Sequence, residues 1–328
     1  MANSMRFGEV PGIELPISRL VQGTMQVAVN DDAVGFAQMD SAWDAGINCL
    51  DTAAVYGGGG ANDKFVGRWM KARGNRDKVV VLAKGAHHND LRKRVTPHDI
   101  GSDLHDSLAR LQTDYVDLYV LHRDDPSVPV GPIVDALNAY VKAGKIRAFG
   151  GSNWTAARLA EANAYAAESD QIPFAVSSPN FSLADQLKEP WEGCVTISGP
   201  ERAAERANYA QTGMPLFTWS SMAGGFLSGR ITRDNGSTFT GYFDKLAVEC
   251  YASEDNFKRL DRAGEIAAIK GISVPQIALA YVLSYPLNIF AIVGSANGAE
   301  VQSNVEALNT TLTRAEMAYL DLMLDSLE

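Results

Sequence analysis

Four ionisable side chains near the start of the chain have the types and positions that proton-transfer chemistry needs. Three short apolar runs end in Asp51, Lys84 and His122, and Tyr56 follows the first of these runs within the segment 48–60, NCLDTAAVYGGGG. A lysine at the edge of an apolar interior needs an anion beside it, because burying an unpaired charge is costly. Asp51 can provide that anion, so the sequence predicts an ion pair between Asp51 and Lys84.

An ammonium group near a phenol lowers the pKa of the phenol, because a cation favours the phenolate. A free tyrosine titrates near ~10, which is too high for easy proton transfer at neutral pH. We therefore expect Lys84 to lower the pKa of Tyr56 and to make it a general acid. A neutral His122 can donate a hydrogen bond to a substrate oxygen and orient a carbonyl group. Taken singly, structural roles fit as well: Asp51 as a loop cap, Lys84 as a strand cap and His122 as a core histidine.

Eight short apolar runs, rich in β-branched residues, recur along the chain and predict buried parallel strands. These runs are 19–25, 47–51, 78–84, 115–122, 146–152, 174–178, 216–221 and 289–295. Helical patterns lie between them, at 32–46, 96–111, 132–144, 155–167, 200–210, 273–284 and 299–308. In the pattern at 96–111, Thr96 is the predicted N-cap and Pro97 takes the first helical position.

This alternation predicts an α/β fold, a single (β/α)8 TIM barrel over residues 1–328. The C-terminal strand ends of such a barrel form one mouth, where the four ionisable residues are expected to meet. An N-terminal β-hairpin is predicted at 6–18, with its turn at Pro11-Gly12, and a long functional loop at 230–256, before the last strand. An open doubly wound sheet is the alternative, but such sheets carry GxGxxG after their first strand, and this strand ends VQGTM.

Composition limits the classes of partner. The formal net charge of −10 argues against nucleic acid and anionic membranes. No apolar run reaches the roughly 18 residues of a membrane span, and MANSMRFGEV has neither a basic leader nor a signal segment. Three widely spaced cysteines without CxxC favour reduced thiols, so we expect a cytoplasmic protein. No metal cluster, GxSxG elbow or GxxxxGK[ST] loop is predicted.

The motifs LDTAAVYG, LAKG, LHRDDP, GGSNW and IVGSANGAEVQSNVEAL occur in that order. With these motifs the sequence resembles the aldo-keto reductase superfamily over nearly its whole length. The resemblance implies a barrel without a Rossmann domain that binds NADPH, or less often NADH, across its mouth and reduces aldehydes and ketones. It places that family's catalytic tetrad on Asp51, Tyr56, Lys84 and His122, in agreement with the roles inferred above.

The resemblance also implies how the nicotinamide is held. Ser152 and Asn153 match the pair that binds its carboxamide, and Trp219 matches an aromatic ring that stacks on it and fixes the face presented to substrate. Ser178 stands where the family usually has Gln to complete the carboxamide clamp. Its side chain is too short for the same bond, so a water molecule or Asn180 is the expected substitute.

Other cofactor contacts follow from the same motifs, and Asp51 is counted among them. They lie at the first strand end, in the loop over the pyrophosphate and in the adenosine segment, where a helix N-terminus favours phosphate: Gly23, Thr24, Met25, Ser220, Met222, Gly224, Phe226, Ser295, Asn297 and Asn304. Trp154 is expected to line the substrate pocket beside Tyr56 and His122, although a packing role fits it as well.

The choice between the two cofactors depends on the segment after the last strand. Many family members carry Lys or Arg there for the 2′-phosphate of NADPH, but no Lys or Arg occurs at 291–312. The corresponding positions are Gly294, Asn297 and Glu300. Glu300 would repel a 2′-phosphate and can accept a hydrogen bond from a ribose hydroxyl, which favours NADH against the family's habit. Arg230 or Arg233 is the alternative source of charge for a phosphate.

The sequence as a whole predicts an NAD(P)H-dependent reductase of small carbonyl compounds, with Tyr56 as general acid. One alternative is a Schiff-base lyase on the same barrel with Lys84 as nucleophile, although a lyase needs no nicotinamide clamp. The other is a nucleotide-sensing binding subunit, since some relatives are partners of channels. The physiological substrate and the oligomeric state are not predicted, because loop sequences reveal little about specificity.

Overall fold

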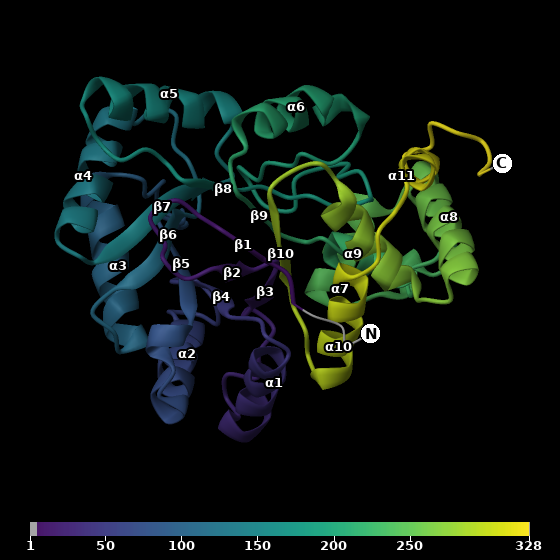
Figure 1. The fold of residues 1–328 in the computed structure, drawn as a ribbon, viewed down its shortest axis with the longest axis horizontal. Helices are drawn as coiled ribbons and strands as arrows, with labels where there is room; N and C mark the ends of the chain where they lie inside the picture. Colours follow the sequence, from purple (N-terminus) through teal and green to yellow (C-terminus); the bar gives the residue numbers. More distant parts are fainter. Residues whose placement is uncertain (1–4, 328) are drawn as a thin grey trace.

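The computed structural model of the chain describes residues 5–327. Its centre is a closed barrel of eight parallel strands, completed where β10 pairs with both β9 and β3 (Figure 1). The strands are β3 (Leu20–Gly23), β4 (Cys49–Ala53), β5 (Val80–Gly85), β6 (Val116–Leu121), β7 (Ile146–Ser152), β8 (Val176–Ser178), β9 (Leu216–Thr218) and β10 (Ile289–Val293). Each overlaps one of the eight predicted runs, and the predicted (β/α)8 barrel is confirmed.

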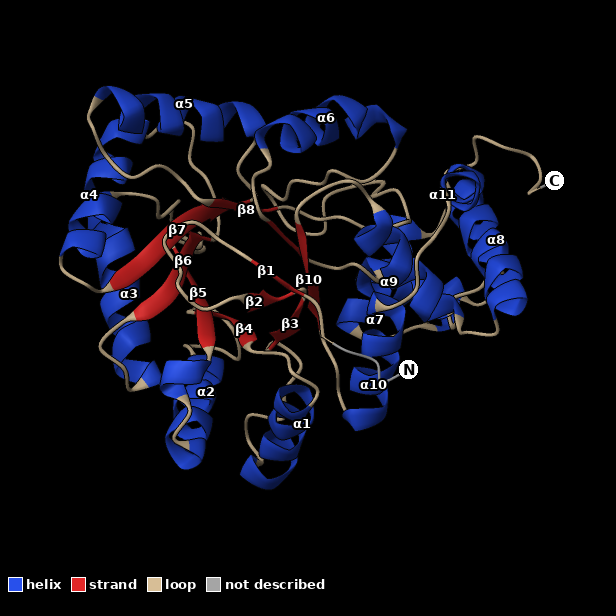
Figure 2. Cartoon of the chain, in the orientation of Figure 1, coloured by secondary structure: helices blue, strands red, loops and turns tan. Residues whose placement is uncertain are grey.

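Helices surround the strands (Figure 2). Those that follow the strands in turn are α1 (Asp32–Asp44), α2 (Ala61–Arg73), α3 (Pro97–Leu111), α4 (Val130–Lys142), α5 (Ala156–Glu168), α6 (Ala203–Thr212), α9 (Val274–Ser284) and α10 (Gly298–Leu308), and α11 (Arg314–Leu320) comes last. Helix α3 begins as predicted, because the Thr96 hydroxyl accepts a hydrogen bond from the Asp99 N–H at 3.3 Å. No single described helix is both long and apolar enough to cross a membrane.

The predicted N-terminal hairpin is also confirmed. Strands β1 (Phe7–Gly8) and β2 (Ile17–Ser18) pair antiparallel, and Gly12 in the turn between them has a φ of 85°. Val10 and Ile17 of the hairpin are buried in the same apolar cluster as Val21, at the start of the barrel. The hairpin therefore covers the end of the barrel from which the strands begin, opposite the mouth.

The segment 230–256 differs from its prediction as a long loop. It contains a short 3₁₀ helix, η4 (Gly236–Thr238), then helix α7 (Tyr242–Tyr251) and the first turn of α8 (Glu254–Lys270). Helix α7 forms because Ala247, Cys250 and Tyr251 bury one face in the main apolar cluster, a tertiary effect that outweighs the loop-like composition. Packing on η3 (Ala223–Ser228) orders this segment.

The pleat of the strands decides which side chains face the barrel interior. Cys49 of β4 and Leu82 of β5 lie in the interior apolar cluster. Because side chains alternate along a strand, Asp51 and Lys84, two residues further on, point to the same side, one layer nearer the mouth. His122, directly after β6, continues this alternation and points to the same side as Asp51 and Lys84. The functional layer therefore lies directly on an apolar layer that excludes water from below.

We predict that Gly67 of α2 is required for the close packing of α2 on α3. A Cβ at this position would lie 2.7 Å from the carbonyl oxygens of Arg110 and Leu111, which are backbone atoms that cannot rotate away. Gly67→Ala should lower the free energy of unfolding by about 1–3 kcal/mol in urea denaturation. Gly264→Ala in α8, where a Cβ meets nothing within 4 Å, is the matched control and should raise it by about 0.5–1 kcal/mol. A Gly67→Ala protein as stable as the wild type would contradict this packing.

Candidate active site

A buried ion pair lies at the mouth of the barrel. The ammonium group of Lys84 contacts the carboxylate of Asp51, and the two side chains are only 3% and 5% exposed. The same ammonium donates a hydrogen bond to the Tyr56 hydroxyl over 3.1 Å. Burial lowers the pKa of Lys84, but the charge of Asp51 and the contact with Tyr56 outweigh burial and hold this pKa above its ordinary value. Lys84 is therefore a cation at neutral pH.

The pKa of Tyr56 does not follow the prediction made from the sequence. Burial raises this pKa above its ordinary value, Lys84 opposes the rise, and the negative charge of Asp51 adds to it. The expected net lowering was wrong because burial of the phenol outweighs the effect of the ammonium, which the charge of Asp51 also partly offsets. The phenol consequently keeps its proton at neutral pH. Since Lys84 is the donor in their hydrogen bond, that proton is free to be donated elsewhere.

His122 lies beside this group as a neutral ring. Its ring centroid is 5.8 Å from that of Tyr56 and 4.8 Å from that of His87. Burial, followed by the charges of Lys84 and Arg123, lowers the pKa of His122 well below its ordinary value. Within residues 5–327, its Nδ1 atom is buried without a hydrogen-bond partner. A neutral imidazole in this place can offer an N–H to a substrate oxygen.

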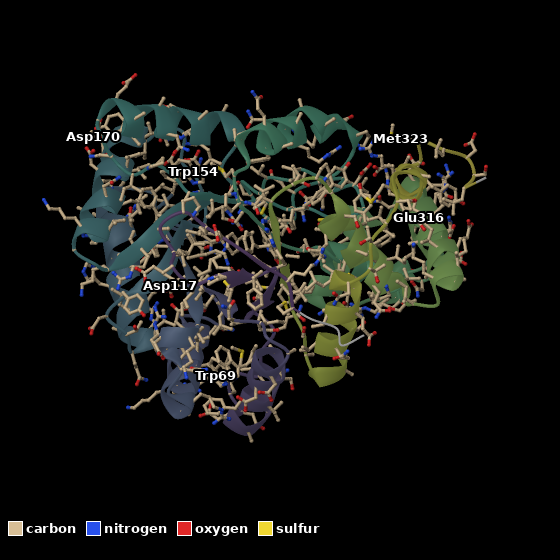
Figure 3. The ribbon with its side chains drawn as sticks, viewed as in Figure 1. Trp69, Asp117, Trp154, Asp170, Glu316 and Met323 are labelled. Atoms are coloured by element: carbon tan, nitrogen blue, oxygen red, sulfur yellow. The ribbon has the colours of Figure 1, made fainter. Side chains whose placement is uncertain are left out.

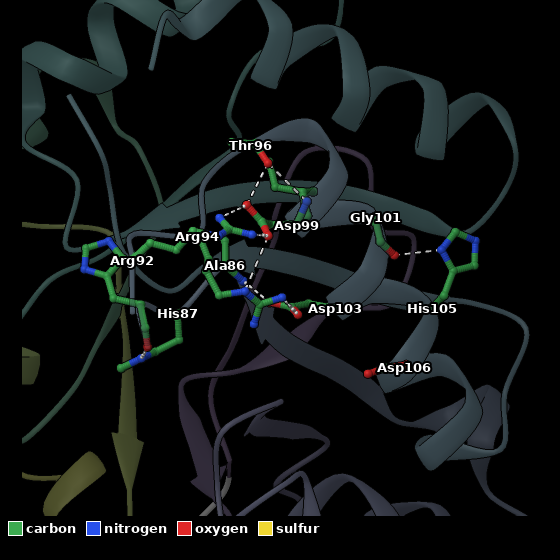
Figure 4. A network of polar contacts seen from close by, with 12 residues as sticks. Ala86, His87, Arg92, Arg94, Thr96, Asp99, Gly101, Asp103, His105 and Asp106 are labelled. Atoms are coloured by element: carbon green, nitrogen blue, oxygen red, sulfur yellow. Dashed lines mark hydrogen bonds and ion pairs between the residues drawn. The ribbon is translucent and has the colours of Figure 1, made fainter. Parts of the chain in front are cut away.

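A polar network holds the turn that follows Lys84 (Figure 4). The N–H of Ala86, whose φ is 58°, donates to Oδ2 of Asp103 over 2.8 Å, and Arg94 pairs with the other oxygen of that carboxylate at 2.6 Å. Asp99 is bound in turn by Arg92, which holds the pKa of Asp99 well below its ordinary value. This network fixes the end of β5, and therefore the base of the Lys84 side chain, against α3.

Next to the tetrad, Ser152 and Asn153 adjoin each other at the end of β7. The Ser152 hydroxyl donates to the carbonyl oxygen of Ser178 over 2.9 Å. Asn153 donates to the carbonyl oxygen of His122 over 3.2 Å and accepts from the N–H of Val195 over 3.0 Å. Both side chains are thus oriented by neighbouring strand ends. These bonds tie three strand ends together at one edge of the mouth.

Several buried polar atoms near the ends of β3, β8 and β9 have no partner among residues 5–327. They are Gln22 Oε1, Ser178 Oγ, Thr218 Oγ1, Trp219 Nε1 and Ser221 Oγ. Buried polar groups are normally hydrogen-bonded, so a cluster of unpaired ones fits a surface that a polar ligand completes. The residues present therefore fit a bound nicotinamide cofactor. Asn180, the expected substitute for Ser178, is already committed, since it accepts from Thr196 over 2.7 Å and donates to the Trp219 carbonyl over 3.2 Å.

The remaining predicted cofactor residues lie at the ends of β3 and β10 and in the loop after β9. Thr24 donates from its N–H and its hydroxyl to the carbonyl oxygen of Asp51, each over 3.0 Å, and Gly23 precedes it at the end of β3. The loop after β9 is sharply bent, with positive φ at Ser220 and Gly224, and Phe226 is buried. Met222 packs against the main apolar cluster, which also contains Phe226. Met25 is exposed at the rim of the mouth. Gly294 and Ser295 directly follow β10.

The start of α10 is an acidic helix cap. Asn297 is the N-cap and accepts from the N–H of Glu300 over 3.0 Å, while the Glu300 carboxylate accepts from the N–H of Ala296 over 2.9 Å. Asn304 donates to Ser295 over 3.0 Å. The two arginines proposed as alternative phosphate ligands are both in ion pairs: Arg230 with Asp244, and Arg233 with Glu254 and Asp261.

Trp154 has the surroundings of a core residue. Its side chain is fully buried beneath α5 (Figure 3), 5.0 Å from the ring of Phe174, and its Nε1 donates to the carbonyl oxygen of Arg123 over 3.2 Å. The ring would have to leave this packing to touch a substrate, so its position does not support the expected role in the pocket.

Sequence reasoning also passed over Arg123 and His87 at the same mouth. The available signal was adjacency, because Arg123 directly follows His122 in LHRDDP.

Comparison with known proteins agrees with this geometry. The model of the Aldo/keto reductase family matches residues 19–325. "Uncharacterized oxidoreductase YrpG" of Bacillus subtilis is 28% identical, over 94% of this chain and 92% of its own. "Aryl-alcohol dehydrogenase [NADP(+)]" of Phanerodontia chrysosporium is 25% identical, over 95% and 83%. "Probable voltage-gated potassium channel subunit beta" of Oryza sativa is 30% identical, over 83% and 81%. The chain therefore belongs to the aldo/keto reductase family of oxidoreductases.

Proposed function

We propose that the chain is an NAD(P)H-dependent reductase of aldehydes and ketones, built as one barrel domain, in which Tyr56 is the proton donor. The observation that carries the proposal is the 3.1 Å hydrogen bond from Lys84 to the Tyr56 hydroxyl, with Asp51 on the other side of the ammonium. The orphaned polar atoms beside it support a nicotinamide site on the same mouth. A small carbonyl compound would lie between Tyr56 and His122.

The chain's own residues handle the proton and the charge. When bound, the reduced nicotinamide supplies a hydride to the carbonyl carbon. Tyr56 donates its proton to the carbonyl oxygen as negative charge develops there. The Lys84 ammonium, already in place, stabilises the phenolate that remains on Tyr56, and Asp51 keeps that ammonium in position. In the oxidative direction the Tyr56 phenolate accepts the proton from the alcohol.

His122 orients the substrate. Its neutral ring lies beside Tyr56, so that an N–H from one residue and an O–H from the other can converge on a single oxygen. Two converging donors define the direction of a carbonyl group more strictly than one. A charged imidazolium in the same place would compete with Tyr56 as the acid, and the lowered pKa of His122 prevents this.

The cofactor is proposed to lie against Ser152, Asn153 and Trp219, with its adenosine end near the start of α10. The family typically uses NADP(H), and one relative is named for NADP(+). The departure proposed for this chain is a preference for NADH. The Glu300 carboxylate, engaged as a helix cap, places negative charge where a 2′-phosphate would need a cation. Both candidate arginines are already paired with carboxylates.

Two other functions have weaker support. A Schiff-base lyase needs an uncharged amine, whereas the ion pair with Asp51 keeps Lys84 protonated. A nucleotide-binding subunit without turnover is suggested by the name of the rice relative. The presence of all four tetrad side chains at one mouth favours turnover.

Tyr56→Phe should lower kcat by roughly 10²–10⁴, because it removes only the acidic hydroxyl. The dissociation constant for the reduced cofactor, measured by fluorescence titration, should stay within about threefold of the wild type. Tyr165→Phe, which removes a hydroxyl bonded to Asp135 on the outside of the barrel, is the matched control and should keep full activity. A Tyr56→Phe enzyme with near wild-type turnover would show that another group is the acid.

Cofactor choice is tested by kcat/KM for NADH and NADPH with one aldehyde. The wild type should prefer NADH, and Glu300→Gln should raise kcat/KM for NADPH by roughly 3- to 10-fold, because it removes a repulsive charge while keeping an amide oxygen for the cap. Glu306→Gln removes one charge from the same helix, further from its start, and should leave the ratio unchanged. A strong wild-type preference for NADPH would refute this part of the proposal.

A further inference from the structure

Arg123 is a buried cation without a counter-ion among residues 5–327. Four lysine and arginine side chains within residues 5–327 are buried, with exposures of 3–8%. Three of them are neutralised by a carboxylate: Lys84 by Asp51, Arg158 by Asp124 and Arg259 by Asp185. Arg123 is only 4% exposed and has no carboxylate within ion-pair distance among the described residues. Burial of an uncompensated charge is costly, so its retention calls for an explanation.

Hydrogen bonds orient this guanidinium without neutralising it. Its Nε donates to the carbonyl oxygen of Glu192 over 3.2 Å, and its Nη1 donates to the carbonyl oxygen of His122 over 2.9 Å. Its Nη2 has no hydrogen-bond partner within residues 5–327. Asp124, the next residue, pairs with Arg158 instead, and Glu189, on the segment whose Glu192 carbonyl oxygen Arg123 contacts, accepts from the N–H groups of Gly193 and Cys194.

The charge lies beside His122 at the mouth. The Arg123 guanidinium donates to the carbonyl oxygen of His122 over 2.9 Å, and the ring of His122 lies 5.8 Å from that of Tyr56. After burial, the charges of Lys84 and Arg123 both lower the pKa of His122. Asp51 already balances Lys84, so Arg123 is the buried cation of the mouth that no carboxylate of residues 5–327 pairs with, in a protein whose formal net charge is −10.

We infer that Arg123 is a specificity-determining residue that binds an anionic group of the substrate, a carboxylate or a phosphate carried near the reactive carbonyl. A guanidinium that is already oriented and has an unused N–H is suited to bind an oxyanion, which accepts that hydrogen bond and balances the charge. An anion would be repelled by the acidic surface and needs a local cation to be captured. This inference deepens the proposed function and rests on it.

The test compares charged and neutral aldehydes of matched shape. The pairs are 4-carboxybenzaldehyde with benzaldehyde, for a carboxylate, and glyceraldehyde 3-phosphate with glyceraldehyde, for a phosphate. We would measure kcat and KM for the wild type, Arg123→Met, Arg123→Lys and Lys93→Gln. Arg123→Met keeps the apolar stem and Arg123→Lys keeps the charge. Lys93 is exposed on the loop after β5, and Lys93→Gln removes one positive charge near the same mouth.

The wild type should favour the charged member of at least one pair by about 10-fold or more, mainly through KM, and the preferred pair identifies the anion. Arg123→Met should lose that preference, so that the charged and neutral members of the pair are reduced with similar kcat/KM. Arg123→Lys should retain part of the preference and Lys93→Gln all of it. No preference in the wild type, or one that survives in Arg123→Met, would overturn the inference.

Failure of the proposed function would give a different result from failure of this inference. If the wild type reduces none of the four aldehydes with either cofactor, the reductase assignment falls, and calorimetry with benzoate and inorganic phosphate still tests the anion site. Binding of one of these anions to the wild type that weakens about tenfold in Arg123→Met supports the inference. Absence of binding, or equal binding by both proteins, overturns it. Circular dichroism checks that each variant is folded.

Discussion

The structure of the mouth depends on keeping one ammonium group buried. Lys84 can stay charged within the barrel only because Asp51, on the neighbouring strand, faces it. Register makes this contact: Lys84 of β5 pairs with Ala53 of β4, and the N–H of Tyr56 then bonds to the Ala53 carbonyl oxygen over 3.0 Å. The same turn therefore brings the phenol to the ammonium. The closed barrel, the apolar layer below and the clamp on Ala86 all serve to hold these groups in place.

The two buried cations of the mouth differ in how they are balanced. Burial keeps the proton on Tyr56, and Asp51 offsets the opposing charge of Lys84. In the proposed reaction, a strong electrostatic effect therefore arises only when negative charge develops. Arg123 donates to two carbonyl oxygens and has no carboxylate partner within the described part of the chain, so its charge is not balanced there. A balanced cation suits catalysis, which needs stabilisation of a transition state. An unbalanced cation suits recognition, which needs attraction before any reaction begins.

Much of the fold could be predicted because strand and cap signals are local. The eight runs of β-branched residues and the Thr96 cap of α3 correspond to observed elements. Helix α2 was not predicted because it follows four glycines and has no side-chain N-cap, and α7 was not because its stability comes from packing. The motifs also brought the tetrad together. They could not give the pKa of Tyr56, the burial of Trp154 or the lack of a carboxylate partner for Arg123 among residues 5–327, since each depends on surroundings that distant segments create.

The most direct test of the central claim is the titration of Tyr56 by ¹³C NMR with label at Cζ, in the wild type, Asp51→Asn and Lys84→Met. We predict that Tyr56 stays protonated past its ordinary pKa near ~10 in the wild type. The pKa should fall in Asp51→Asn, where the ammonium is no longer balanced, and rise in Lys84→Met, where the cation is gone. The same pKa in all three proteins would contradict the claim that this ion pair controls the proton of Tyr56.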